Sequence, residues 1–114
     1  YAGSDRLKEV AWYDDNSHNQ TKPIGRKMPN ELGLYDMSGN VWEWCGDWYD
    51  ENYYNLCHGK GTVEDPSGPD TGSCRVVRGA SWNFIPEFCR VAHRGWEYPD
   101  YRNGNLGFRL VFVP

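Results

Sequence analysis

Two acidic side chains, Asp36 and Glu43, stand where they could bind a hard metal ion. They lie on either side of the turn Ser38-Gly39-Asn40, with backbone carbonyl groups between them. Calcium takes about six to eight oxygen ligands, and a turn that leads into a strand can aim alternate carbonyls at one point. In the alternative interpretation, Asp36 caps the turn and Glu43 pairs with an arginine.

The four cysteines, Cys45, Cys57, Cys74 and Cys89, lack the C-x-x-C spacing of a zinc site. Cys57 and Cys74 flank a stretch rich in Gly, Pro and Asp that has little apolar core. A disulfide between them would restrict the unfolded chain, so we expect this pairing. Cys45 and Cys89 either form a second disulfide or stay reduced as small buried residues. A disulfide favours an extracytoplasmic location, at the cell surface or secreted, whereas four free thiols favour the cytoplasm.

The charge and hydropathy patterns exclude two kinds of partner. The net charge is -4, and acidic and basic residues are interspersed along the chain, so no basic patch for nucleic acid is expected. No apolar run approaches the ~20 residues that span a bilayer, so we expect no membrane insertion by this segment.

Ser81 and His93 are present, but no spacing pairs a nucleophile with a base.

The elements that must position these residues are short. Alternating apolar residues predict strands at 41–45, 75–78, 89–94 and 107–113, with Trp42 and Trp44 on one face of the first. Their connections are too short for crossover helices, so we expect an antiparallel sheet, and we expect residues 47–72 to form a loop. The predicted fold class is a loop-rich α+β domain with little helix.

Such elements make a poor core for a chain of 114 residues, which is one domain at most. We therefore expect an upstream segment of the same domain to complete the core.

The last third of the chain carries large aromatic residues in the gaps between strand-like pieces. Aromatic side chains in loops on a rigid scaffold are typical of a binding face. In the alternative interpretation, Phe84, Phe88 and Trp96 are simply the core of a small aromatic-rich domain.

The string from Asn30 to Trp44, NELGLYDMSGNVWEW, resembles the central motif of the formylglycine-generating-enzyme (sulfatase-modifying factor) domain. Residues 75–82 and 107–110 fit the same pattern, and the resemblance covers nearly the whole chain. It implies a C-type-lectin-like fold of a loop-rich α+β type, of which residues 1–114 are the C-terminal part, without the domain's N-terminal part. It also implies a structural calcium ion held by the side chains of Asp36 and Glu43 and the carbonyl oxygens of Gly39 and Val41.

The chain departs from this family at the catalytic site. The resembling enzymes oxidise a substrate cysteine with a copper-binding pair of cysteines. The first position of that pair falls at Phe84, which cannot ligate copper, and the second falls at or near Cys89. One thiol cannot make a two-sulfur site, so we expect neither copper nor enzyme activity.

The pattern from Ser81 to Arg109 resembles the variable region of proteins diversified by diversity-generating retroelements. There, adenine-directed mutagenesis randomises selected codons on the exposed face of a lectin-like fold. The resemblance implies a variable ligand-binding region at 75–110, in a non-catalytic, receptor-like or adhesin-like protein that binds a protein or other macromolecular surface. The alternatives are a fixed non-catalytic accessory module and a formylglycine-generating oxidase. The ligand-binding positions implied are Phe84, Ile85, Phe88, His93, Gly95, Trp96, Glu97, Tyr98, Tyr101, Asn103, Gly104 and Asn105.

Arginines flank the apolar strand positions of the same region. We expect them to support the scaffold, with guanidinium groups bridging loop carbonyls and carboxylates, rather than to contact ligand. These are Arg78, Arg90, Arg94, Arg102 and Arg109.

Overall fold

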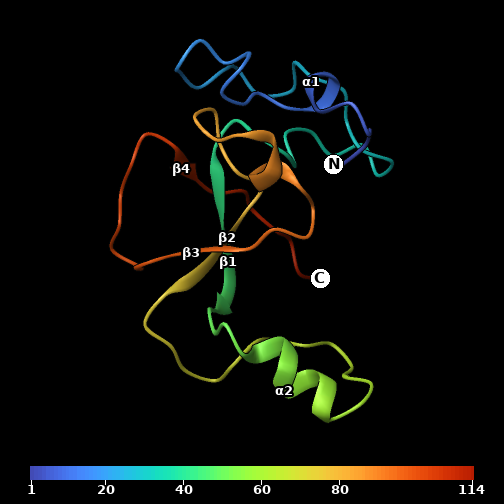
Figure 1. The fold of residues 1–114 in the computed structure, drawn as a ribbon, viewed down its shortest axis with the longest axis vertical. Helices are drawn as coiled ribbons and strands as arrows, with labels where there is room; N and C mark the ends of the chain where they lie inside the picture. Colours follow the sequence, from blue (N-terminus) through green and yellow to red (C-terminus); the bar gives the residue numbers. More distant parts are fainter.

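The computed structural model describes residues 1–114, and its centre is a four-stranded sheet in the order β3-β2-β1-β4 (Figure 1). β2 pairs antiparallel with both β1 and β3, whereas β1 pairs parallel with β4. The strands are β1 (Trp42–Trp48), β2 (Arg75–Arg78), β3 (Gly95–Glu97) and β4 (Leu106–Gly107). The helices are α1 (Leu7–Val10), α2 (Tyr53–Gly59) and the 3-10 helix η1 (Pro86–Cys89).

The pairing of β1 with β2 follows the alternation of their side chains. Trp44 lies opposite Val77, and both contribute to the apolar core, as does the buried Trp42. This confirms the prediction that Trp42 and Trp44 share a face. On the other face, Glu43 lies opposite Arg78. The register shifts between Trp44 and Trp48, so β1 is irregular in its second half.

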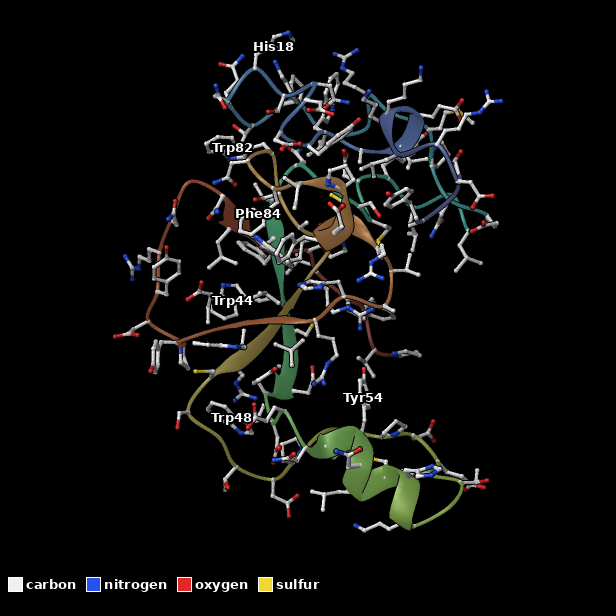
Figure 2. All side chains as sticks on the ribbon, viewed as in Figure 1. His18, Trp44, Trp48, Tyr54, Trp82 and Phe84 are labelled. Atoms are coloured by element: carbon white, nitrogen blue, oxygen red, sulfur yellow. The ribbon has the colours of Figure 1, made fainter.

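The core is small and lies at one end of the molecule. α1 and η1 sit close together at that end, while α2 lies at the opposite end (Figure 1). Figure 2 shows the same division among the side chains: Phe84 and Trp82 lie toward α1, and Trp48 and Tyr54 lie toward α2. The buried residues of the core are Leu7, Val10, Ala11, Trp42, Val77, Ala80 and Cys89.

Buried polar residues add hydrogen bonds to this small core, and Asn40 makes four of them. Its side chain accepts a hydrogen bond from the backbone N–H of Lys22 and donates one to the carbonyl of Lys22, both at 3.0 Å. Its backbone N–H donates to the carbonyl of Trp12 at 2.7 Å, and its carbonyl accepts from the N–H of Trp82 at 2.8 Å. One residue thus joins the N-terminal loops to the chain that follows β2.

The prediction of a strand at 89–94 is wrong. Pro86 begins a 3-10 turn in its place, and Cys89 is fully buried at the end of that turn. The third strand starts at Gly95 instead. A Cβ atom there would lie 3.1 Å from a methyl group of Val77 and 3.5 Å from the ring of Trp42, so the close approach of this strand to β2 favours glycine.

The prediction of a wholly antiparallel sheet is also wrong, because β4 runs parallel to β1. These two strands are far apart in the sequence, so the short connections between consecutive strands placed no limit on their direction. The strand predicted at 107–113 is confined to Leu106–Gly107. Beyond it, no strand pairs with the chain, and its apolar side chains are 73–89% exposed: Phe108, Leu110, Val111, Phe112 and Val113.

The segment predicted as a loop at 47–72 contains α2, a helix with no buried residue. Sequence periodicity gives no sign of it, because it has no apolar face to bury. The predicted Cys57–Cys74 disulfide is not formed, and all four cysteines are free. Cys57 instead lies one turn after Tyr53 on α2, and its thiol raises the pKa of that tyrosine. None of the helices is long and apolar enough to cross a membrane.

Replacing Gly39 by alanine should destabilise the fold far more than the same change at Gly33. Both glycines have a left-handed backbone, with φ of +80° and +75°, which costs alanine about 1–2 kcal/mol. A Cβ atom at Gly39 would also lie 2.4 Å from the carbonyl oxygen of Trp12, whereas nothing lies within 4 Å at Gly33. We expect Gly39→Ala to lose about 1–3 kcal/mol more than Gly33→Ala in urea unfolding of the full-length protein. Equal losses would contradict this packing.

Candidate functional site

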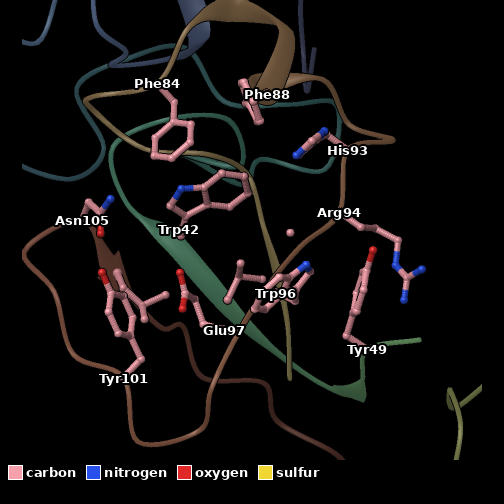
Figure 3. Close-up of a pocket in the computed structure, with 13 residues that line it drawn as sticks. Trp42, Tyr49, Phe84, Phe88, His93, Arg94, Trp96, Glu97, Tyr101 and Asn105 are labelled. Carbon is pink, nitrogen blue, oxygen red and sulfur yellow. The ribbon is translucent and has the colours of Figure 1, made fainter. Parts of the chain in front are cut away.

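A cavity of about 350 Å³ opens beside β1 and β3, where the loops of the last third of the chain meet (Figure 3). This volume lies within the usual range for ligand pockets, about 300–1,000 Å³. It brings together eight of the twelve expected ligand-binding residues: Phe84, Phe88, His93, Gly95, Trp96, Glu97, Tyr101 and Asn105. The remaining lining comes from Trp42, Tyr49, Val77, Arg94 and Leu106.

The inner wall of the cavity is a chain of aromatic rings anchored on β1. Phe84 meets Trp42 edge to face, with ring centroids 5.2 Å apart, and meets Phe88 at the same distance. The ring centroids of Phe88 and His93 are 4.7 Å apart. Phe84 and Phe88 are partly buried against the core. Phe84 and Phe88 therefore belong to the core, as in the alternative interpretation, and they also line the cavity.

The outer wall is exposed. Trp96 is 47% exposed and Tyr101 is 40% exposed, although both are large aromatic residues. Trp96 lies between Tyr49 and Tyr98, with centroid distances of 6.2 Å to each. Exposed aromatic side chains grouped in this way offer a large contact area at low cost in side-chain entropy.

Four of the expected residues do not line the cavity: Ile85, Tyr98, Asn103 and Gly104. Ile85 and Tyr98 are about half exposed, and Tyr98 packs on Trp96 from outside. Asn103 donates a hydrogen bond to the hydroxyl of Tyr101, and the carbonyl of Gly104 accepts one from the indole of Trp82. The last two therefore shape the loop that carries Tyr101.

Backbone contacts hold these loops on the sheet. The N–H of Trp42 donates to the carbonyl of Asn105 at 2.8 Å, next to the parallel pairing of β1 with β4. The side chain of Asn105 also donates to that of Asn83, at 3.2 Å. The two loops that frame the cavity are thereby joined to each other and to β1.

The charged groups of the cavity differ in their surroundings. Arg94 forms an ion pair with Asp47 at 3.6 Å and lies over the rings of Tyr49 and Tyr54. Burial lowers the pKa of His93, and the positive charges of Arg90 and Arg78 lower it further. Glu97 takes part in none of the three ion pairs of the molecule.

The expected scaffold role of the arginines is confirmed for four of them. Arg78 donates to the carbonyl of Val91, and Arg90 donates to the carbonyl of Glu87. Besides the Arg94–Asp47 pair, Arg109 holds Glu43 through two hydrogen bonds of 2.5 Å. Arg102 is exposed.

Three of the four residues predicted to bind calcium, Asp36, Val41 and Glu43, line a second cavity of about 410 Å³ at the turn before β1. Asp36 is buried, and its Oδ2 accepts a hydrogen bond from the N–H of Gly25 at 2.8 Å, while Oδ1 has no partner. Glu43 pairs with Arg109, as in the alternative interpretation. A carboxylate offers about four acceptor positions, and the two hydrogen bonds from Arg109 occupy two of those of Glu43. No three acidic, histidine or cysteine side chains converge on one point, so any cation here depends on backbone carbonyls.

Sequence reasoning missed Tyr49 and Arg94 as lining residues. Tyr49 follows the irregular end of β1, and its N–H donates to the carbonyl of Cys74 at 2.8 Å. Only the tertiary pairing with the start of β2 turns it toward β3. Arg94 was expected in the scaffold, and it has that role, but it lines the cavity as well.

Comparisons with known proteins agree on a family. The model of the sulfatase-modifying factor enzyme 1-like domain matches residues 2–113. The formylglycine-generating enzyme of Streptomyces coelicolor is 43% identical over 100 residues, which cover 85% of this chain and 31% of that enzyme. Among solved structures, Treponema denticola variable protein 1 has a TM-score of 0.81 and 40% identity, over 93% of this chain and 38% of that one. PvdO from Pseudomonas aeruginosa has a TM-score of 0.75 and 26% identity, over 95% of this chain and 42% of that one. The chain therefore spans less than half the length of these relatives.

The lowered pKa of His93 predicts a dependence of stability on pH. Below the usual histidine pKa of about 6.5, the unfolded chain binds a proton that the folded state resists, so the free energy of unfolding falls as the pH falls. His93→Gln should reduce the decrease in melting temperature between about pH 7 and pH 5. The matched control is His58→Gln, because His58 is exposed on α2. Identical pH profiles for the wild type and His93→Gln would contradict this assignment.

Proposed function

This chain belongs to the sulfatase-modifying factor enzyme 1-like domain family, and from that premise we propose that it is a non-catalytic ligand-binding module. It has the mixed α+β fold of formylglycine-generating enzymes and C-type-lectin-like proteins. The proposed role is that of a variable protein of a diversity-generating retroelement, which binds a protein or other macromolecular surface. Such a role would place it at the cell surface or outside the cell, whereas the four free cysteines favour the cytoplasmic alternative.

The arrangement of the cavity is the observation that carries this proposal. Eight of the twelve positions that the variable-region pattern selects line one cavity, and they come from three separate stretches of the chain. Trp96 and Tyr101 leave a large part of their rings exposed there. The likeness to Treponema denticola variable protein 1 supports the same interpretation.

The surroundings of Phe84 and Cys89 weigh against the oxidase that the relatives' names would indicate. The ring of Phe84 packs on Trp42, where a copper-binding thiol would be needed. Cys89 is fully buried, and this burial raises the pKa of its thiol to about 12, with Asp14 and Glu87 acting in the same direction. A thiol of this kind stays protonated at neutral pH and is a poor metal ligand and nucleophile.

A fixed accessory module is the competing proposal. The burial of Phe84 and Phe88 favours it, because randomising a residue packed on the core would endanger the fold. Under this alternative the cavity would serve one unchanging partner.

We also propose that a further segment of the same protein covers the apolar residues at 108–113. Five apolar side chains there are 73–89% exposed, and neighbouring exposed apolar side chains are typical of a surface that another segment covers. A strand added beside them would bury these side chains and pair their backbone groups.

The binding proposal predicts opposite outcomes for two alanine variants of the full-length protein. Trp96→Ala should abolish ligand binding and leave the free energy of unfolding within about 1 kcal/mol of the wild type, because the ring is about half exposed. Phe84→Ala should cost about 2–4 kcal/mol, because its ring fills space between Trp42 and Phe88. Binding is measured with ligands selected from a displayed library, and stability by urea unfolding. Unfolding of Trp96→Ala would support the fixed module instead.

Calcium at the turn before β1 is a separate proposal, which rests on the unpartnered Oδ1 of the buried Asp36 and the free acceptor positions of Glu43. The carbonyl oxygens of Gly39 and Val41 would complete the protein's share of the ligands. There the ion would supply positive charge that stabilises the turn. EDTA should lower the melting temperature of the full-length protein, and Asp36→Asn should remove most of that effect. An unchanged melting temperature in EDTA would refute the site.

A further inference from the structure

The cavity has one acidic group without a charged partner. Glu97 lies on β3, where Arg75 is its neighbour across the sheet, yet it forms no ion pair with that residue or any other. Figure 3 shows its carboxylate pointing into the cavity between Trp96 and Tyr101. It is half-buried there rather than free in water.

The other ionisable groups of the cavity do not balance this charge. The guanidinium of Arg94 is already paired with Asp47 and stacked over two tyrosine rings. His93 is in contact with the ring of Phe88 and beside the ring of Trp42, and its surroundings oppose protonation. Arg75 donates to the carbonyl of Gly46 and lies over the ring of Trp48, so Glu97 is the one acidic group of the lining and has no cation paired with it.

The remaining walls are aromatic and suit the same kind of ligand. The faces of tryptophan, tyrosine and phenylalanine rings attract cations, most strongly where water is excluded. Five such rings line the cavity in addition to Trp42: Tyr49, Phe84, Phe88, Trp96 and Tyr101. An anion would be repelled by Glu97, and a purely apolar group would leave Glu97 desolvated without a partner.

We propose that this cavity binds a lysine or arginine side chain presented by a protein ligand, with Glu97 as the partner of its charge. The alkyl part of the side chain would lie along the aromatic walls, and the charged end would reach the carboxylate. A cavity of about 350 Å³ holds one such side chain, so the rest of the ligand would lie on the exposed rings of Trp96 and Tyr98. The inference rests on the proposed binding function and names the chemistry of its ligand.

Selection from a random peptide library displayed on phage tests the inference on the immobilised full-length protein. We expect the selected peptides to be enriched in lysine or arginine at one position relative to the starting library. Glu97→Gln should lose this enrichment while keeping the wild-type melting temperature. The matched control is Glu64→Gln, which removes the same charge at an exposed position outside the cavity and should keep the enrichment.

A direct titration then isolates the charge. In the best selected peptide, the basic residue is replaced by norleucine, which keeps an alkyl chain without a charge. We expect the Kd for the wild-type protein to rise about tenfold or more, and the Kd for Glu97→Gln to change little. Binding peptides without basic enrichment, or an equal effect of norleucine on both proteins, would overturn the inference and leave the binding function standing. A selection that yields no binding peptide would overturn both.

Discussion

The hydrogen bonds of Asn40 are the constraint on which the rest of the structure depends. The apolar core holds only seven buried residues, too few to fix the long loops by packing alone. Asn40 joins the carbonyl of Trp12, both backbone groups of Lys22 and the N–H of Trp82, while Gly39 beside it donates to the carbonyl of Gly79 at 2.7 Å. An amide side chain suits this place because it donates and accepts at once, and asparagine tolerates the φ of +67° found there better than most residues do.

Other buried hydrogen bonds fix the backbone near the cavity without involving the exposed side chains of its outer wall. Ser38 donates to the carbonyl of Cys89 at 3.0 Å and Ser17 donates to that of Trp82 at 2.7 Å, so buried hydroxyl groups fix both ends of the segment 82–89, which includes η1. The rings of Trp96 and Tyr101 take no part in these bonds. Side chains at the outer wall can therefore change without loss of the backbone path, which is what a variable binding surface requires. Phe84 and Phe88 are different, because their rings pack against the core.

Sequence patterns predicted the parts of the fold that depend on local alternation. The strand at Arg75–Arg78 and the shared face of Trp42 and Trp44 are as expected, and so is the fold class. The errors have tertiary causes: the strand beside β2 starts at Gly95, whose close approach to Val77 and Trp42 no local pattern encodes, and β4 runs parallel to β1 across a large sequence separation. The family resemblance located most of the cavity, but Tyr49 reaches it only through the pairing of β1 with β2, which no local pattern encodes. The calcium ligands and the variability of the surface stay predictions.

Sequencing the locus that encodes this chain in many independent isolates would show whether a constant scaffold presents a diversified cavity. We expect a second, imperfect copy of the stretch that encodes residues 75–109, which differs from it mainly at adenines. Substitutions among isolates should gather at the exposed outer wall, as at Trp96 and Tyr101, and spare Asn40, Ser81 and Trp42. A single invariant copy, with no excess of changes at the cavity, would contradict the account and leave a fixed module with one partner.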